Sequence, residues 1–285
     1  MKSNPKHGRA RLVALAATMT AVAVGAPVAI GVAAPAVAAV AKKETITMSG
    51  STSVAPLAAK LAQAYIKKCG GCVQFRLLQG GSDVGVSDVA AGAVTIGNSS
   101  RDPKPSDPGG LVFNKIAKDA ICIITNKSNP LPDLSQETVQ AVFGGSVRNW
   151  SGVPGSSADG TIDVVVRTPA SGTQDAFQKI FMGSTSVFSG ASAQASNGLV
   201  QQKVQSDPNG VGYVSLAFAD GTSANPYKGV ACTLENAKAG TYLGLRNFYM
   251  VTKGDPQGRT AKFIHWIQTN QKAAKIVATE WVPLS

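Results

Sequence analysis

The chain has 285 residues and a formal net charge of +11 at pH 7. Its lysines and arginines are scattered rather than gathered in a basic block, which argues against a nucleic-acid-binding protein and favours a solvated surface. The length is more than a single core usually needs and is enough for two lobes of roughly 100 to 130 residues each.

The N-terminus has the pattern of a secretory signal peptide. Its first eleven residues are basic without an acid, and an Ala/Val-rich run follows from Leu12 to about Ala34. Small residues at Ala36 and Ala38 predict cleavage after residue 38, and no apolar run of transmembrane length follows. No lipoprotein cysteine stands at the cleavage site. We therefore expect residues 1–38 to be removed and the mature protein to be extracellular, associated with the cell wall or periplasmic.

Export exposes the four cysteines to an oxidising compartment, where pairing is expected. Cys69 and Cys72 are separated by two glycines and can close a tight loop. Because they follow a predicted helix end, we interpret them as a structural disulfide rather than a redox site, and two ligands are too few for a closed structural zinc site. Cys122 and Cys232 either pair with each other or stay buried as free thiols, and the sequence leaves both possibilities open.

Strands and helices alternate along the mature chain. β-Branched runs end in Gly/Ser turns that lead into amphipathic segments, which predicts an α/β fold with a largely parallel sheet. In the first half, strands are predicted over 44–48, 73–78, 94–96 and 120–125, and helices over 54–68, 84–91 and 135–143. In the second half, strands are predicted over 162–166, 210–215 and 248–252, and helices over 174–182, 187–204, 258–269 and 271–280.

Three of the turns share one chemical device. At 49–53, 80–83 and 170–173 a strand ends in a Gly/Ser/Thr turn that begins a helix. Such a turn offers backbone N–H groups at the positive end of the helix dipole, together with hydroxyl donors. Each turn alone is explained by ordinary helix capping, but three together predict an anion site.

Arg167 adds a cation to the third turn. It ends an apolar strand four residues before Ser171, where a planar guanidinium can contact an oxyanion held by the helix that follows. The alternative is a surface arginine paired with Asp175. Neither catalytic nor cofactor motifs accompany these donors: His265 is the only histidine after the signal peptide, and the chain lacks a metal-binding cluster and the GxSxG, P-loop and GxGxxG patterns. We therefore predict a binding protein, not an enzyme, with no cofactor.

Together these segments resemble the phosphate-binding proteins of phosphate-specific ABC transporters, over essentially the whole mature chain. The segments that carry the resemblance are GSTSVAPLA from Gly50, QGGSDVGVSDVAAGAVTIGNSSRD from Gln79, VFGGSVRNWSGVPG from Val142, RTPASGT from Arg167 and DPNGVGYVSLAF from Asp207. The resemblance implies a type II periplasmic-binding-protein fold with a ligand cleft between two α/β lobes. Lobe I would comprise 39–124 and 216–285, lobe II would comprise 125–215, and the chain would cross between them near Thr125 and Tyr213.

The resemblance also implies a set of phosphate ligands. These are Thr52, Ser53, Ser82, Arg167, Ser171, Gly172 and Thr173. Some family members have an aspartate in the loop after the third strand, where this chain has Ser100. Three readings stay open: Asp102 reaches the anion, Ser100 accepts the hydrogen bond of the phosphate proton, or selectivity is relaxed and rests on Arg101 and Arg167. We favour Ser100 and Arg101 as ligands, with Asp102 orienting an arginine.

The function that follows is capture of inorganic phosphate and its delivery to the permease subunits of an ABC importer in the membrane, by a monomer that does not bind nucleic acid. Alternatives are a receptor for sulfate, molybdate or another tetrahedral oxyanion, a secreted phosphatase, and a wall-associated scaffolding protein. The first differs in ligand preference, the second in turnover, and the third binds no oxyanion.

Overall fold

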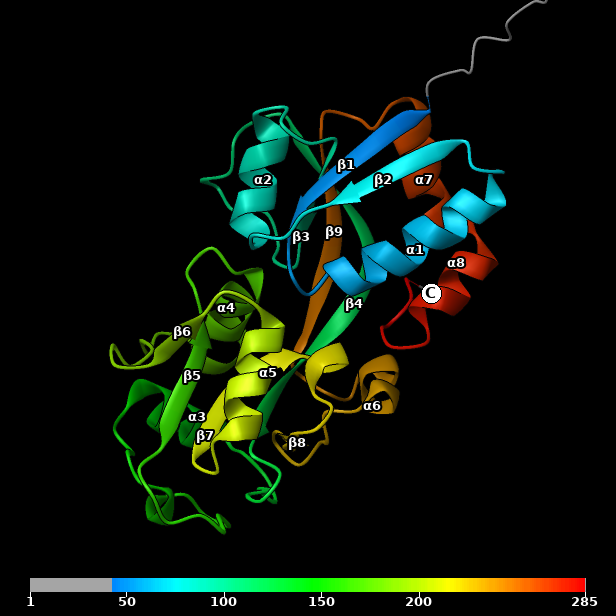
Figure 1. Cartoon of the computed structure of the whole chain (residues 1–285). Helices are drawn as coiled ribbons and strands as arrows, with labels where there is room; N and C mark the ends of the chain where they lie inside the picture. The colour runs from blue at the N-terminus through cyan, green and yellow to red at the C-terminus, as the bar shows by residue number, and fades with distance from the viewer. Residues whose placement is uncertain (1–42, 285) are drawn as a thin grey trace, which may run out of the picture. The chain divides into compact units, whose positions relative to one another are not determined.

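The computed structural model describes residues 43–284 (Figure 1). The predicted signal peptide, residues 1–38, and its cleavage site lie outside the described residues. In the part of the chain that the structure describes, no helix has the length and apolar character needed to cross a membrane.

Helices and strands alternate along much of the described chain, as predicted. The strands are β1 (Glu44–Gly50), β2 (Val73–Leu77), β3 (Ile96–Ser99), β4 (Leu111–Thr125), β5 (Asp163–Arg167), β6 (Ser192–Gln194), β7 (Gly210–Ser215), β8 (Ser223–Ala224) and β9 (Leu245–Lys253). The helices are α1 (Ala55–Lys68), α2 (Ser82–Ala90), α3 (Gln136–Gly144), α4 (Gly172–Phe177), α5 (Asn197–Ser206), α6 (Leu234–Ala239), α7 (Gly258–Thr269) and α8 (Gln271–Val277). Short 3-10 turns occupy Trp150–Gly152 and Leu216–Phe218, and a π turn over Gln178–Met182 continues α4.

The strands form one mixed sheet in the order β2-β1-β3-β9-β4-β7-β5-β6, with β8 paired to β4. The outer pairs, β1 with β2 and β3, and β5 with β6 and β7, are parallel. The central pairs of β9 with β3 and β4, and of β4 with β7, are antiparallel. The α/β class is thus confirmed, but the sheet is mixed rather than largely parallel because the long strands β4 and β9 run against their neighbours.

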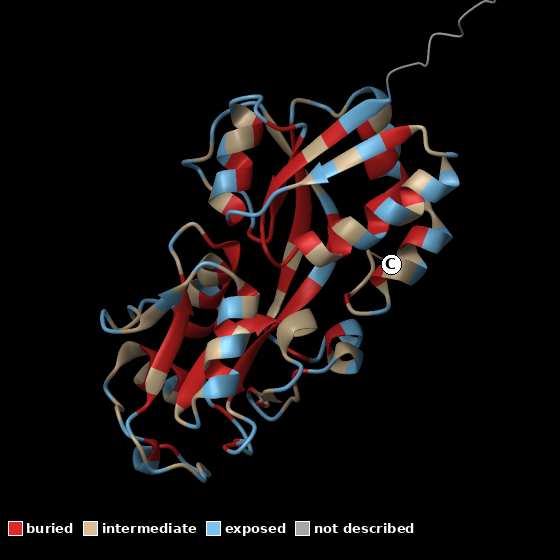
Figure 2. Ribbon diagram, viewed as in Figure 1, coloured by how far each residue is buried: buried red, intermediate tan, exposed pale blue. Residues whose placement is uncertain are grey.

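The first lobe is built on both faces of β1, β3 and β9. Alternate residues of β9 face opposite sides, as strand geometry requires: Phe248 and Met250 join one core with α1, α7 and α8, whereas Tyr249 and Val251 join a smaller core under α2. The buried stripes of these helices face the sheet in Figure 2. The helix α1 ends with Lys67 and Lys68, where the negative end of the helix dipole favours positively charged side chains.

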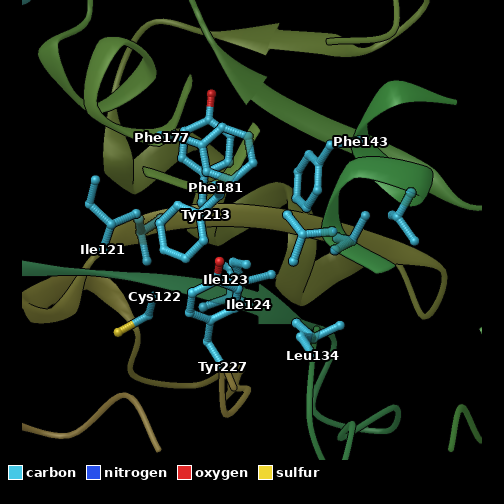
Figure 3. Close-up of a cluster of buried hydrophobic side chains, with 14 of the residues drawn as sticks. Ile121, Cys122, Ile123, Ile124, Leu134, Phe143, Phe177, Phe181, Tyr213 and Tyr227 are labelled. Carbon is cyan, nitrogen blue, oxygen red and sulfur yellow. The ribbon is translucent and has the colours of Figure 1, made fainter. Parts of the chain in front are cut away.

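The second lobe is built around the end of β4 and around β5 and β7. Its core is rich in aromatic rings, with Phe177 stacked on Tyr213 at 3.8 Å between centroids (Figure 3). The helix α3 joins this core between a Ser135 cap, whose side chain accepts from the Thr138 N–H, and the left-handed Gly145. Tyr227, Cys232, Ala237 and Tyr242, which follow β7 in the chain, pack in the same core.

Both long strands carry side chains of both main cores. On β4, Ala117 belongs to the core of the first lobe and Ala120 to that of the second. On β9, Phe248 belongs to the first core, and Leu245 packs against the second. The two lobes are therefore continuous along β4 and β9, at the point where these strands pair with each other.

Several predicted elements differ from the structure. The strand predicted at 94–96 lies instead at Ile96–Ser99, so it includes the start of the segment predicted as a polar loop. The strand predicted at 120–125 begins at Leu111. Its first half was missed because polar residues, which lie in its less buried part, interrupt the apolar run. The helix predicted over 187–204 is replaced by β6 and α5, with the latter starting only at the Ser196 cap. The elements β8 and α6 were not predicted, because they are too short to show a periodicity.

Both cysteine pairs are disulfides, Cys69 with Cys72 and Cys122 with Cys232. The first closes a loop with a sequence separation of 3, whereas the second has a separation of 110 and ties β4 to the segment before α6. Cross-linking distant residues restricts the unfolded chain more. We expect Cys122→Ala/Cys232→Ala to lower the free energy of unfolding by about 4 kcal/mol, and Cys69→Ala/Cys72→Ala by about 2 kcal/mol or less. Urea unfolding of the two variants measures the difference, and equal losses would contradict it.

Candidate functional site

The turn before α1 brings three buried hydroxyls together. The Ser51 Oγ accepts hydrogen bonds from the backbone N–H groups of Ser53 at 3.2 Å and Val54 at 3.3 Å. It then donates its own hydrogen to the Ser100 Oγ at 2.8 Å. Thr52 and Ser53 are also buried. The turn is therefore held from behind by Ser51, which leaves the hydroxyls of Thr52 and Ser53 for other contacts.

The turn before α2 meets the loop after β3 through two serines. The Ser100 N–H donates to the Ser82 Oγ at 3.0 Å, and the two hydroxyl oxygens are 3.3 Å apart. Gly81 precedes Ser82 with a φ of +98°, a conformation that favours glycine, and a Cβ there would lie 2.6 Å from the Ala170 carbonyl oxygen. This turn of the first lobe thus lies directly against the second.

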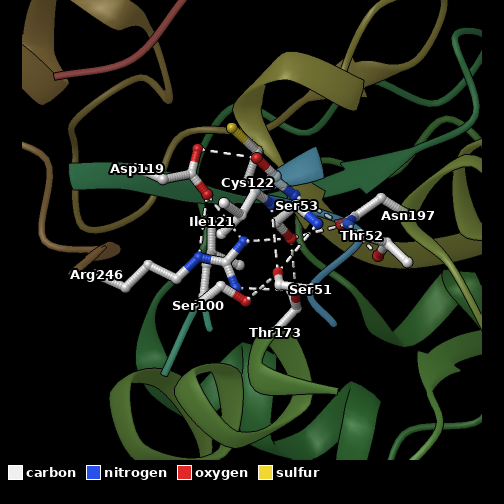
Figure 4. Close-up of polar contacts among 12 residues, drawn as sticks. Ser51, Thr52, Ser53, Ser100, Asp119, Ile121, Cys122, Thr173, Asn197 and Arg246 are labelled. Atoms are coloured by element: carbon white, nitrogen blue, oxygen red, sulfur yellow. Dashed lines mark hydrogen bonds and ion pairs between the residues drawn. The ribbon is translucent and has the colours of Figure 1, made fainter. Parts of the chain in front are cut away.

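The turn before α4 supplies the second lobe's contribution. Ser171 caps α4, since its side chain accepts from the N–H groups of Thr173 and Gln174. The Thr173 Oγ1 lies 2.9 Å from the Ser53 Oγ (Figure 4), and a Cβ on Gly172 would lie 2.3 Å from the Ser82 Oγ. The three turns predicted as anion-binding are therefore adjacent in space, two from the first lobe and one from the second.

Arg167 lies beside these turns as a buried cation. Its guanidinium donates to the Thr52 Oγ1 at 3.1 Å and the Thr173 Oγ1 at 3.4 Å, and to the backbone oxygens of Gln194 and Ala195. Within residues 43–284 it has no carboxylate partner: Asp175, considered above as its partner, pairs with lysines instead. Burial lowers the pKa of Arg167 to about 10, so the group stays protonated at neutral pH.

Two further residues complete the cluster and were missed in the sequence. The Asn197 Nδ2 donates to the Thr52 Oγ1 at 3.0 Å and the Ser53 Oγ at 2.8 Å. The Arg246 guanidinium donates to the Thr173 Oγ1 at 2.8 Å and the Ser53 Oγ at 2.9 Å. A signal existed for Asn197, because Ser-Asn-Gly before α5 resembles the other polar turns. Arg246 lies inside a strand, where no local pattern distinguishes it from a surface arginine.

Asp119 holds Arg246 in place. The two residues are directly opposite each other on β4 and β9, and the Asp119 Oδ2 accepts from the Arg246 Nε at 3.0 Å and Nη2 at 2.8 Å. The Ser215 hydroxyl donates to the Oδ1 at 2.9 Å. Burial raises the pKa of the Asp119 carboxyl against the influence of these contacts, and burial likewise lowers the pKa of Arg246.

The structure does not bring Arg101 or Asp102 into the cluster. The Arg101 guanidinium pairs with Asp83 at 2.6 Å and Asp107 at 2.6 Å, which fixes the loop after β3. The Asp102 Oδ1 accepts from the Tyr249 hydroxyl at 2.7 Å and the Asn247 amide at 3.1 Å, so its carboxylate orients these side chains and not an arginine. In contrast, Ser100 lies in the cluster through Ser51 and Ser82.

An open cleft lies beside the cluster. It has a volume of about 340 Å³, and Arg101, Asp102, Lys118 and Arg246 line it on one side, with Asp175 and Lys179 of the second lobe on the other. Among the described residues, no group of three His, Cys, Asp or Glu side chains is placed to hold a metal ion. What the cluster offers is a set of hydroxyl, amide and guanidinium donors, which is the chemistry that binds oxyanions.

Comparison with known proteins agrees with this geometry. Residues 34–271 match the model of the PBP superfamily domain. The phosphate-binding protein PstS of Bacillus subtilis (strain 168) is 26% identical over 247 residues, which cover 85% of this chain and 81% of the relative.

Solved structures give the same result. A structure from Clostridium perfringens, described as a phosphate ABC transporter substrate-binding protein with bound phosphate, is 32% identical with a TM-score of 0.79, covering 85% of this chain and 100% of that one. An ABC-type phosphate transport receptor from Vibrio cholerae is 28% identical with a TM-score of 0.68, covering 83% and 99%. The chain therefore belongs to the PBP superfamily and has the two-lobed fold of its substrate-binding members.

Proposed function

We propose that this protein binds inorganic phosphate between its two lobes and delivers it to an ABC importer in the membrane. The observation that carries the proposal is Arg167, a buried guanidinium without a carboxylate partner in the described chain, surrounded by hydroxyl and amide donors. A buried cation without a counter-charge is costly, and an anion bound beside it relieves that cost. The names of the relatives, which are phosphate-binding and phosphate-transport proteins, support phosphate as the anion.

The ligands that we propose come from both lobes. From the first lobe they are the hydroxyls of Thr52, Ser53, Ser82 and Ser100 together with Arg246, and from the second lobe they are Arg167, Ser171, Gly172, Thr173 and Asn197. A tetrahedral ion has oxygens pointing in four directions, so donors on opposite walls can satisfy it only together. Binding should therefore hold the lobes closed. Arg101 and Asp102 are left out of this set, because their side chains have other partners.

We also propose that closure bends β4 and β9 near Asp119 and Arg246. At this point of each strand, the side chains on one side pack in the core of the first lobe and those on the other side pack in the core of the second. This position differs from the crossings expected near Thr125 and Tyr213. It assigns residues 216–244 to the second lobe, in whose core Tyr227 and Tyr242 pack. The closed lobes would then be the form that the transporter recognises.

The proposal is for binding without turnover, by an exported monomer that does not bind nucleic acid. Acid–base catalysis would need a titrating group in contact with the bound anion, whereas the proposed ligands are hydroxyls, amides and guanidinium groups, and the Asp119 carboxylate behind them is held by Arg246 and Ser215. His265, the histidine of the described chain, is exposed on α7.

Calorimetric titration of the phosphate-stripped protein, residues 39–285, tests the proposal. We expect heat of binding with phosphate and, in the same cell, no hydrolysis of a chromogenic phosphoester. Equal affinity for sulfate would make the protein a general oxyanion receptor. No heat with either anion would contradict the proposed function and favour a scaffolding role.

A further inference from the structure

The ion pair of Asp119 and Arg246 occupies a special position in the molecule. The two residues are partners across β4 and β9, and their side chains are 1% and 3% exposed. Arg246 is the charged group that contacts Asp119 from β9, and Ser215 contacts it from β7. Since the other Arg246 donors reach Ser53 and Thr173, the pair lies directly behind the proposed phosphate site.

The buried charges whose side chains contact the cluster can be counted, and buried Arg101 is not among them because it pairs with Asp83 and Asp107. Arg167 contributes one positive charge with no carboxylate partner among residues 43–284, and Arg246 contributes a second. Asp119 contributes one negative charge and is held by two hydrogen bonds from the Arg246 guanidinium. The site therefore has a net formal charge of +1. Without Asp119 the same donors would surround the ligand with a net charge of +2.

Charge at this depth acts strongly on a bound ion. Screening by salt is weak for buried groups, and two unit charges a few ångströms apart interact by several kcal/mol even at an intermediate dielectric constant. A site with a net charge of +1 neutralises an anion of charge −1. With an anion of charge −2, the same site keeps one negative charge that is not neutralised. The state of Asp119 thus changes the free energy of a dianion about twice as much as that of a monoanion.

We propose that Asp119 is a specificity-determining residue that sets the charge of the preferred oxyanion without touching it. This inference rests on the proposed function, because it assumes that the anion binds at the cluster. Asp119 limits the attraction of dianions such as sulfate and favours monoanionic phosphate relative to them. Its role thereby differs from that of an acceptor that reads the phosphate proton by a hydrogen bond.

Asp119→Asn isolates the charge. Both Arg246 hydrogen bonds go to one oxygen, Oδ2, which an asparagine carbonyl oxygen can replace. The asparagine amide can then donate to the Ser215 hydroxyl, which rotates to accept. The affinities to compare are those for sulfate and for phosphate, each measured at a pH well below and a pH well above the second ionisation of phosphate. Sulfate is a dianion at both pH values.

We expect Asp119→Asn to shift the affinity ratio of dianion to monoanion by about tenfold or more in favour of the dianion. Arg246→Gln should shift the ratio in the opposite direction. The double variant Asp119→Asn/Arg246→Gln restores a net charge of +1 and should return the ratio to within about threefold of the unmodified protein. It also leaves neither member of the ion pair buried without its partner, so it remains a test if a single variant does not fold.

Lys115→Gln removes an exposed charge from the same strand and is the matched control, with an expected ratio equal to that of the unmodified protein. A purely structural role for Asp119 would weaken all anions alike, and an unchanged ratio in the Asp119→Asn variant would overturn the inference. Absence of phosphate binding by the unmodified protein would instead overturn the proposed function, so the two failures are distinguishable.

Discussion

Replacing Arg167 with alanine should weaken phosphate binding by at least about 100-fold. Removing one partner of a buried, hydrogen-bonded charge pair typically costs about 2–5 kcal/mol. Of the two arginines in the cluster, Arg167 is the one without a carboxylate partner in the described chain. Arg167→Lys retains the charge but not the planar pair of donors, so its phosphate affinity should lie between those of the unmodified protein and of Arg167→Ala. Calorimetry with phosphate measures all three affinities.

The control for this experiment is Arg76→Ala, which removes an exposed arginine from β2 and should leave the affinity unchanged within about threefold. A melting curve without phosphate establishes that each variant is folded. Excess phosphate should then raise the melting temperature of the unmodified protein and of Arg76→Ala, but not that of Arg167→Ala. Undiminished affinity in the Arg167→Ala variant would show that the anion binds elsewhere.

The three anion-binding turns could be predicted because each is a local feature. A β-branched run, a Gly/Ser/Thr turn and an amphipathic helix are all visible within about twenty residues. Parallel pairing of β1 with β2 brings the first two turns to one edge of the sheet, as the α/β pattern predicts. The strand β5 runs in the opposite direction, because antiparallel pairs of β3 with β9, β9 with β4 and β4 with β7 lie between them, so the meeting of its turn with the first two depends on the mixed sheet and could not be predicted. Ser171 illustrates this: the sequence indicates a helix cap, and the structure has that cap next to the first lobe.

Arg246 and Asp119 could not be predicted, because their partnership depends on the register of two strands more than one hundred residues apart. Neither residue has a neighbour in sequence that reveals its burial.

The loop after β3 shows a different limit. Arg101 follows Ser100 directly and carries the charge expected of a phosphate ligand, yet successive residues point in different directions, and only Ser100 faces the cluster.

The segment 187–204 shows the limit of composition as a guide. Its Ser, Ala, Gln and Asn residues are compatible with a helix, and no apolar period marks where a helix begins. In the structure β6 adds to β5 at the edge of the sheet, and α5 then starts at Asn197. The boundary matters for function, since it places Asn197 in the first turn of a helix that faces Thr52 and Ser53.

Replacing Gly172 with alanine should separate closure of the lobes from folding. A Cβ at this position would lie 2.3 Å from the Ser82 Oγ and 2.9 Å from the Ser100 Oγ, and both serines belong to the first lobe. The clash is therefore made only when the lobes are closed. We expect phosphate affinity to fall by about 100-fold, on the order of 3 kcal/mol, because the α4 turn can no longer reach the anion together with α1 and α2.

Stability without phosphate should respond differently. Gly172 does not have the positive φ that favours glycine, and alanine reduces the conformational freedom of the unfolded chain, so the free energy of unfolding should stay equal or rise by up to about 1 kcal/mol. Gly198→Ala, in the first turn of α5, is the matched control, since the nearest atom to its Cβ would be 3.9 Å away. It should bind phosphate like the unmodified protein. If Gly172→Ala bound phosphate equally well, the lobes would not close on the anion through this turn, whereas a loss of stability equal to the loss of affinity would mean that Gly172 serves folding rather than closure.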